Sequence, residues 1–335
     1  MQAVLIGCGD HGGGILIPAC LSAGIRLTCL VDRNTDRARA LAGQWNIPRV
    51  HASVDELDAG SGVDAEAAIV ALPPTEQAHH AAWALSGGLH VFIEKPPALD
   101  PGELQALVSH ARTAGRACCV GMNFRSADGM RALIGRLRSG RHGQVSFARI
   151  TQVARKPIAP FHERTSFEAS LFYAQGIHAL DLALMLVPGP QSVSGQFLNV
   201  KRGLFCTVTG ENASAGSRFE TSFGSCGAGL YHEVNVLSES GDLLSLRNLS
   251  ELICHPNGGE PSIGEYPGAR VLWRRSPAGV GYASAGYSTE LAAFRQRITG
   301  GQPGGPDGVA ELDQLVPVYD AFDSLLRARG LQWMT

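Results

Sequence analysis

The chain is almost without lysine. Only Lys95, Lys156 and Lys201 stand among its 28 basic residues, so the other 25 are arginine. Thirty acidic residues leave a formal net charge of −2 and a pI of about 6.6. Proteins that bind nucleic acid or an anionic membrane by charge carry a basic excess. This composition lacks one, and we expect neither kind of partner.

Paired cysteine motifs are also missing. The eight cysteines include no Cys-x-x-Cys pair, and the adjacent Cys118 and Cys119 lie in an apolar stretch. We therefore expect buried free thiols in a reducing cytoplasm rather than a disulfide framework. No cluster of histidine, cysteine and acidic residues has the spacing of a metal site, so no metal is predicted.

Long apolar segments are a third absence. We find no uninterrupted apolar run that is long enough to span a bilayer. The N-terminus has no basic residue before Arg26 and meets a glycine turn at once, which predicts a first β-strand rather than a signal peptide.

A substantial core is present instead. The length of 335 residues and the hydrophobic content of 44% predict two ordinary globular domains. In the first, expected to be residues 1–121, short apolar strands alternate with helices. The strands are predicted at 3–6, 26–31, 67–72, 89–93 and 117–120, and the helices at 13–23, 35–43, 75–86 and 100–114. This order predicts an α/β fold with a doubly wound parallel sheet.

The pattern changes after Gly121. Residues 122–335 are expected to form a second, α+β domain, whose last helix is free to pack back on the first. From 191 to about 275, short strands separated by Gly, Ser and Asn turns predict a mixed, largely antiparallel sheet. A further strand is predicted at 145–153, and helices at 127–138, 168–186, 288–298 and 309–329.

A glycine-rich turn follows the first strand. Gly7, Gly9 and Gly12 fit the pattern G-x-G-x-x-G, with Asp10 and His11 between the last two glycines. Gly7 permits a tight turn, Gly9 lets a pyrophosphate approach the backbone, and Gly12 lets helix and strand pack closely. The position between a strand and a helix predicts a dinucleotide site.

Asp32 ends the second strand, 20 residues beyond Gly12. A carboxylate there accepts both ribose hydroxyls of an adenosine and repels a 2′-phosphate, which favours NAD(H). Arg33 and Arg37 lie close by and are able to hold a 2′-phosphate, so NADP(H) stays open.

Glu94-Lys95-Pro96 ends another strand of the same domain. Arginine does not give up its proton in proteins, whereas a partly buried lysine can be tuned to donate or accept one. A lysine beside a nucleotide fold, in a chain that otherwise uses arginine, is a candidate catalytic residue.

These motifs together resemble the glucose-fructose oxidoreductase/inositol dehydrogenase family (Gfo/Idh/MocA). The resemblance is carried by the stretches Gly7–Gly12, Ala71–Pro74 with His79, Glu94–Pro96, Gly176–Asp181 and Ser288–Phe294. It spans nearly the whole chain, and the ordered set is more specific than any one piece.

The resemblance implies a Rossmann domain followed by an open-faced mixed sheet, through which a homodimer or homotetramer often forms. It also implies hydride exchange between a nicotinamide ring and a carbon bearing a hydroxyl, typically on a sugar or cyclitol. Lys95 matches the family lysine at the reacting oxygen, and His178 matches the acid/base histidine. Pro73 and Pro74 match residues on the nicotinamide side, and the matching stretches place Leu72, His79 and Glu94 among the cofactor-binding residues. The peptide bond into Pro96 is often cis in relatives.

One position departs from the family pattern. Family dehydrogenases commonly have an aspartate four residues before the histidine, where this chain has Ala174. Residues i and i+4 share a face of an α-helix, so the carboxylate would act with the histidine and lysine. Tyr173 is a candidate replacement, although one residue along an α-helix points about 100° away.

Several polar residues are candidates for binding the substrate. They are Lys95 and His178, together with Asn123, Arg125, Arg155, Lys156, His162 and Arg164 in loops around the second domain's first strand. Cations there would suit a carboxylated, phosphorylated or otherwise acidic substrate. An ordinary solvated surface is the simpler interpretation for most of them.

Three functions are compatible with these residues. The leading one is an NAD(P)-dependent oxidoreductase that acts on an alcohol or ketone carbon of a polar small molecule. The second is an imine or amino-sugar reductase, in which Ala174 would reflect a different route of proton transfer. The third is a dinucleotide-binding regulatory protein without turnover, since fold alone does not specify function.

Overall fold

In the computed structural model, residues 1–58, 64–163, 165–189, 192–258, 268–276, 281–300 and 308–334 are described. The chain forms two compact units. Met1–Ser126 and Val280–Val316 make the first, and Ala127–Gly279 and Pro317–Thr335 make the second. The sequence suggested a boundary at 121/122, and a last helix returning to the first domain. In the structure it is the penultimate helix α11 (Tyr287–Gly300) that belongs to the first unit.

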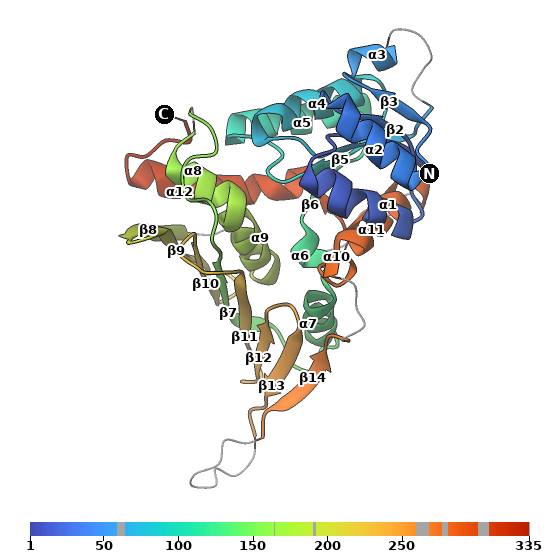
Figure 1. Ribbon diagram of the computed structural model, residues 1–335. Coiled ribbons are helices and arrows are strands. Elements are labelled where there is room, and N and C mark those ends of the chain that lie inside the picture. Colours follow the sequence, from blue (N-terminus) through green and yellow to red (C-terminus); the bar gives the residue numbers. More distant parts are fainter. Residues whose placement is uncertain are drawn as a thin grey trace. The chain divides into compact units, whose positions relative to one another are not determined.

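A seven-stranded sheet forms the centre of the first unit, in the order β15-β6-β5-β4-β1-β2-β3. Six strands pair in parallel, as predicted. They are β1 (Gln2–Ile6), β2 (Arg26–Val31), β3 (Arg49–His51), β4 (Ala67–Val70), β5 (His90–Glu94) and β6 (Cys118–Gly121). Their side chains are largely buried, because helices cover both faces of the sheet. Helices α4 (Pro74–Ser86) and α5 (Pro101–Ala114) lie on one face, and α1 (Ile17–Ser22) and α11 on the other (Figure 1).

Local signals place the helix starts where the sequence suggested. The Asn34 side chain accepts a hydrogen bond from the backbone N–H of Arg37 at the start of α2 (Thr35–Trp45). The Asp100 side chain accepts one from the N–H of Glu103 in α5. Such caps satisfy backbone donors that have no partner within the helix.

Two edge strands were not predicted. β3 has only three residues, too few for a periodic signal. β15 (Ala310–Glu311) pairs antiparallel with β6 and is followed by a 3-10 turn, η3 (Leu312–Leu315). The expectation of a continuous helix over 309–329 is therefore wrong at its start, because α12 covers only Val316–Ala328. Backbone pairing with β6 overrides the local apolar pattern there.

The second unit contains an eight-stranded sheet in the order β14-β13-β12-β11-β7-β10-β9-β8. All neighbours are antiparallel except β7 and β10, which confirms the predicted mixed sheet. The strands are β7 (Val145–Val153), β8 (Ser192–Val200), β9 (Gly203–Asn212), β10 (Ser217–Gly224), β11 (Tyr231–Ser238), β12 (Leu243–Arg247), β13 (Glu251–His255) and β14 (Arg270–Arg274). Helix α9 (Ile177–Leu186) packs on β7 and β10, and α7 (Asp128–Arg138) on β12, β13 and β14 (Figure 1).

One helical stretch contradicts an expectation about membranes. Phe167–Leu186 is long and apolar enough to cross a bilayer, although we expected no such run. It comprises α8 (Phe167–Leu171), a π-helical turn η2 (Phe172–Gly176) and α9. Of its most apolar window, 83% is buried inside the protein. This burial makes it a core helix of the second unit.

Candidate active site

The carboxyl ends of the parallel strands meet at one edge of the first sheet. The glycine turn follows β1, Ala71–Pro74 follows β4, and Lys95 follows β5. The strand order reverses between β4 and β1. Ligands of open α/β sheets bind at such a switch point, outside the carboxyl ends of the strands.

The glycines of the turn are required by close backbone contacts. Gly7 has φ +98°, and a Cβ on it would lie 2.2 Å from the carbonyl oxygen of Ala71. A Cβ on Gly12 would lie 2.1 Å from the carbonyl oxygen of Gly7. Gly9 faces open space, since nothing lies within 4 Å of its would-be Cβ. This is the arrangement that a pyrophosphate on a helix N-terminus needs.

Asp32 is held in place by the glycine turn itself. The backbone N–H of Cys8 donates to its Oδ2 at 2.7 Å, and that of Asn34 donates to its Oδ1 at 2.8 Å. The carboxyl is buried. Burial alone would raise its pKa, but these two hydrogen bonds and the Arg37 guanidinium outweigh burial and lower the pKa. Asp32 is thus ionised at neutral pH and fixed beside the turn.

Arg37 already contacts this carboxylate. Its Nη2 lies 3.2 Å from Oδ1 and 3.1 Å from Oδ2 of Asp32. With the two backbone donors, the guanidinium occupies most of the positions at which the carboxylate accepts. Arg37 thus lies at the carboxylate that would accept the ribose hydroxyls. Arg33 is exposed next to it.

Glu94 connects three elements at the end of β5. The His11 Nε2 lies 2.9 Å from its Oε1, and the Gln77 side chain donates to its backbone carbonyl at 2.9 Å. The N–H of Lys95 contacts its Oε2 at 3.3 Å. Gly121, at the end of β6, leaves room for this carboxylate, because a Cβ there would lie 3.0 Å from Oε1.

Lys95 is partly buried at the same edge. Desolvation lowers the pKa of its amine below the usual lysine range, and the negative charge of Glu94 partly opposes this shift. A lysine of this kind is able to exchange a proton nearer neutral pH than an exposed one. The peptide bond between Lys95 and Pro96 is cis, as the family resemblance implied.

Two residues of α11 join this region without having been predicted. The Tyr287 ring packs edge-on against the His11 ring, with centroids 5.4 Å apart. Glu290 is 1% exposed, and its carboxyl oxygens have no hydrogen-bond partner among the described residues. Burial, and then the charge of Glu94, raises its pKa well above the usual range, which favours the protonated carboxyl. The stretch Ser288–Phe294 entered the family resemblance, but its spacing gave no sign of contact with His11.

The remaining predicted cofactor residues lie along the same edge. Asp10 is exposed in the first turn after Gly9, and Leu72 precedes α4. Pro73 is the N-cap of α4 and Pro74 its first residue. His79 is exposed on α4, and its ring lies edge-on to that of His80.

His178 lies in the first turn of α9, in the second unit, and is buried. The preceding π-helical turn changes the geometry assumed from sequence. The N–H of Ile177 bonds to the carbonyl of Phe172, five residues back. In such a turn, positions five apart lie nearly one above the other. The expectation that Tyr173 points about 100° away from position 174 assumed α-helical spacing throughout, which this turn does not keep.

Tyr173 itself is 1% exposed in an aromatic cluster. Its ring stacks on Trp333, with centroids 6.1 Å apart, and meets Phe172 edge-on. Tyr319 and Phe322 complete the cluster. This packing places the ring in the aromatic core of the second unit.

The other predicted substrate residues separate between the units. Asn123 and Arg125 lie on α6 (Asn123–Ser126) of the first unit, which corrects their expected place in the second domain. Both are buried. Asn123 donates to the carbonyl of Ala285, and Arg125 donates to Gln314 at 2.7 Å. Arg155 and Lys156 are exposed after β7, His162 is half-buried, and Arg164 lies outside the described residues.

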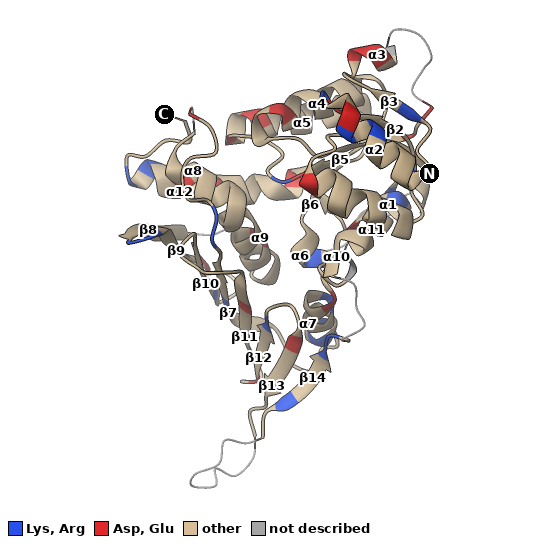
Figure 2. Ribbon diagram, viewed as in Figure 1, with Lys and Arg blue, Asp and Glu red and all other residues tan. Residues whose placement is uncertain are grey.

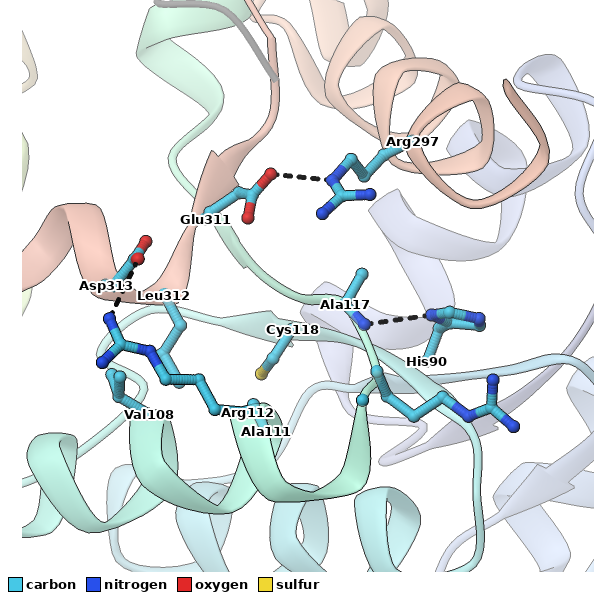
Figure 3. A pocket seen from close by; sticks show the side chains of 12 residues that line it. His90, Val108, Ala111, Arg112, Ala117, Cys118, Arg297, Glu311, Leu312 and Asp313 are labelled. Atoms are coloured by element: carbon cyan, nitrogen blue, oxygen red, sulfur yellow. Dashed lines mark hydrogen bonds and ion pairs between the residues drawn. The ribbon is translucent and has the colours of Figure 1, made fainter. Parts of the chain in front are cut away.

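A separate cavity of about 280 Å³ lies at the opposite end of the first sheet's strands (Figure 3). Two ion pairs cross it, Arg297 with Glu311 at 2.7 Å and Arg112 with Asp313 at 3.5 Å. They fasten α11 and α5 to the segment of β15 and η3. Because it lies at the amino ends of β5 and β6, this cavity is separate from the nucleotide edge.

The sequence comparisons agree with this geometry. Residues 1–122 match the Gfo/Idh/MocA model, described as an oxidoreductase family with an NAD-binding Rossmann fold. Inositol 2-dehydrogenase of Rhizobium meliloti (strain 1021) is 26% identical over 190 residues, which are 57% of this chain and 56% of that protein. A dehydrogenase from Chromobacterium violaceum has a solved structure that superposes with a TM-score of 0.88 at 26% identity, covering 98% of this chain and 95% of that one.

The first 122 residues carry the NAD-binding domain of the Gfo/Idh/MocA family. A further curated relative, the uncharacterised oxidoreductase ORF334 of Rhizobium meliloti, is 30% identical over 174 residues. That alignment covers 51% of each chain, so the match spans about half the length of the curated relatives. The family model confirms the Rossmann fold of residues 1–122, and the superposition confirms the fold of the rest of the chain. Among the described residues, no group of three potential metal ligands comes together.

Proposed function

We propose that this protein is an NAD(H)-dependent oxidoreductase that exchanges a hydride with a hydroxyl-bearing carbon of a polar small molecule. The observation that carries the proposal is Lys95. Its amine has a lowered pKa and directly follows Glu94, whose carboxylate contacts the glycine turn through His11. A proton-exchanging group thus lies at the edge where the family holds its dinucleotide.

The bound nicotinamide would supply the hydride acceptor or donor. Lys95 holds or takes the proton at the reacting oxygen, which stabilises the charge that develops there. His178 assists as a second acid/base, because it matches the position of the acid/base histidine in the family. Tyr173 is proposed to take part of the role that an aspartate at position 174 plays in relatives, and the π-helical turn between it and His178 supports this proposal, because it changes the spacing of the helix there.

NAD(H) is the favoured cofactor. The ionised Asp32 beside the turn opposes a 2′-phosphate. NADP(H) also stays possible, because the Arg37 guanidinium contacts that carboxylate and is therefore close enough to bind a 2′-phosphate. The glycine cradle and the position of Asp32 fit either dinucleotide, so the preference depends on this one ion pair.

The substrate is proposed to be a sugar, a cyclitol or a related polar molecule. One relative is by name an inositol dehydrogenase, and it supports a ring carrying hydroxyl groups. A keto and imino substrate panel with both cofactors separates alcohol chemistry from the alternative, reduction of an imine or amino sugar. Turnover of imino compounds only would favour the alternative.

We also propose a homodimer or homotetramer formed through the second sheet. Its strands alternate buried and exposed positions, with α9 packed on one face. Apolar side chains such as Leu198, Leu237 and Val271 are 40–58% exposed. Light scattering on the purified protein tests this, and a monomer at micromolar concentration would reject it. We further expect a cytoplasmic location, because all eight cysteines are free thiols and seven of them are buried.

The central test combines cofactor binding and turnover. NADH and NADPH are titrated by fluorescence, and the Lys95→Ala and Lys95→Arg variants are then assayed with the preferred cofactor. Both variants should bind the dinucleotide with nearly unchanged affinity and lose turnover, because arginine keeps the charge but cannot release the proton. Retained turnover in Lys95→Arg would reject lysine as the proton-exchanging group.

The regulatory alternative has its own signature. A wild-type protein that binds NADH tightly, turns over nothing in the panel and retains a partner protein in pull-down would support it. Binding of neither dinucleotide would reject both the oxidoreductase and the regulator.

A further inference from the structure

Three loops of the second unit meet at one end of its sheet. β7 and β10 are parallel, with Val153 beside Gly224, so both strands finish at the same end. β9 begins there as well, because it runs antiparallel to β10 and pairs Phe205 with Gly224. The segments 154–158 and 225–228 and the turn at 201–202 between β8 and β9 are therefore neighbours.

Backbone hydrogen bonds hold the three loops together. The N–H of Gly227 donates to the carbonyl of Ala154 at 2.9 Å, and the N–H of Ser225 donates to the carbonyl of Leu204 at 2.9 Å. The Ser225 hydroxyl also accepts from the N–H of Leu204 at 3.1 Å. Between the loops lies a pocket of about 550 Å³, lined by Arg155 and Arg202 among others. Its volume is in the range of small-molecule sites.

Two arginines line this pocket, and each has a lysine next to it in the sequence. Arg155 and Lys156 come from the first loop, and Lys201 and Arg202 from the β8–β9 turn, so two of the chain's three lysines are here. Figure 2 shows both basic segments, one after β7 and one at the end of β8. In the described part of the chain, none of the four side chains has an acidic partner.

Three other exposed arginines of this unit have acidic partners. Arg149 pairs with Glu220, Arg218 with Glu211, and Arg274 with Glu251. An unpaired group of like charges repels itself, whereas paired charges do not. Such a group is stabilised when an anion joins it, and the guanidinium fork matches the oxygens of phosphate and carboxylate.

The pocket is tied to the helix that carries His178. Gln175, three residues before His178, donates to the carbonyl of Lys156 at 3.0 Å and accepts from Gln152 at 2.7 Å. Gly176 packs on Phe223, since a Cβ there would lie 2.7 Å from the ring. Phe223 lies only two residues before Ser225 of the pocket. A ligand at the cations and a reacting group at His178 therefore lie at the same end of this unit.

We infer that this pocket binds an anionic substituent, a phosphate or a carboxylate, of the molecule on which the enzyme acts. The anion binding is argued from the pocket alone. That the anion is part of the substrate rests on the proposed function. Ile158, 78% exposed at the pocket, adds an apolar contact beside the charges.

The direct test measures anion binding by calorimetry on protein saturated with NADH, which removes competition at the glycine turn. Inorganic pyrophosphate and L-tartrate are the probes, and they separate phosphate from carboxylate recognition. We expect one of them to bind, and the Arg155→Gln/Arg202→Gln variant to lose about tenfold or more in affinity. The Arg131→Gln/Arg136→Gln variant, which removes two exposed charges from α7, should keep wild-type affinity.

Two outcomes overturn the proposal. The first is that neither probe binds the wild-type protein. The second is that both double variants weaken binding equally, which would indicate unspecific attraction between the probe and a positively charged surface. The NADH titration that precedes each run separates this failure from failure of the proposed function, because NADH binding does not use these arginines. If light scattering shows that Arg155→Gln/Arg202→Gln alone breaks an oligomer, the cations bind a second copy of the chain, and the small-molecule site is rejected.

A second arm links the pocket to the substrate. Turnover is compared for N-acetylglucosamine and its uridine diphosphate ester, and for glucose and glucuronate. The anionic member of one pair should have the higher kcat/KM, and Arg155→Gln/Arg202→Gln should remove that advantage by raising KM. Equal kcat/KM values within both pairs would contradict a role in substrate binding.

Discussion

The His11 Nε2 lies 2.9 Å from Oε1 of Glu94, a contact between side chains 83 positions apart. It joins the glycine turn after β1 to the residue that precedes Lys95. The carboxylate is mostly buried, and its charge raises the pKa of the Lys95 amine against the effect of desolvation. Glu94 thus joins the glycine turn and the Lys95 amine electrostatically.

Replacing Glu94 with Gln should lower the pKa of Lys95 further, because the opposing negative charge is removed. If Lys95 takes the proton during oxidation, kcat/KM rises with pH as the amine loses its proton. The midpoint of that rise should move to lower pH in Glu94→Gln, as measured by pH–rate profiles. The control is Glu66→Gln, an exposed carboxylate before β4. An unmoved midpoint would separate Glu94 from Lys95.

Replacing Arg37 with Ala should change the cofactor preference. The guanidinium contacts both oxygens of Asp32 and is the cation placed for a 2′-phosphate. We expect the ratio of NADPH to NADH dissociation constants to rise by about tenfold, a change of about 1.4 kcal/mol. Arg39→Ala, which removes an exposed arginine paired with Asp36, is the control. A constant ratio would exclude Arg37 from ribose recognition.

Gly12 at the end of the glycine turn and Gly14 just after it should respond in opposite ways to replacement by alanine. In Gly12→Ala, the new methyl group would clash with the carbonyl of Gly7, so backbone must move. We expect a loss of more than about 2 kcal/mol in unfolding free energy, together with loss of NADH binding. Gly14 is exposed with nothing near its would-be Cβ, and Gly14→Ala should stabilise the helix by up to about 1 kcal/mol. Denaturant unfolding compares the two, and equal stabilities would refute the packing argument.

Glu290 should make the protein less stable as pH rises. Its folded pKa is raised well above 4.5 by burial and by Glu94, so its contribution to stability is full below about pH 4.5. That contribution is lost as pH rises through the folded pKa, at about 1.4 kcal/mol for each unit of the shift. Glu290→Gln cannot ionise, so its advantage over wild type should grow from pH 4.5 to pH 8. Unfolding at several pH values measures this, and a pH-independent difference would contradict a neutral buried carboxyl.

Tyr173→Phe tests the hydroxyl without disturbing the ring packing on Trp333. We expect unfolding free energy and NADH affinity to stay close to wild type. Turnover should fall at least about tenfold, as is typical when a group in proton transfer is lost. Phe172→Tyr is not a suitable control because that ring is fully buried, so Tyr231→Phe on the exposed strand β11 serves instead. Unchanged turnover would make Tyr173 a packing residue only.

The residues of the nucleotide edge are predictable because their signals are local. Gly7, Gly9 and Gly12 indicate a strand–turn–helix unit within a few residues, and Asp32 follows at the end of the next apolar strand. Parallel strands bring their carboxyl ends to one edge, so the order of the strands is enough to place Lys95 near the turn.

The sequence by itself thus determined the order of the main strands and helices, the glycine turn and the position of Lys95 at the end of a strand, since hydrophobic periodicity and turn chemistry act over short distances. Tertiary structure decided what depends on contacts between distant segments. It placed Tyr287 against His11 and Glu290 within the electrostatic influence of Glu94. It also paired β15 with β6, and it placed Arg155 and Arg202 at one pocket. The π-helical turn before His178 was also not visible in the sequence. Burial and strand register likewise depend on the whole fold and not on one local pattern.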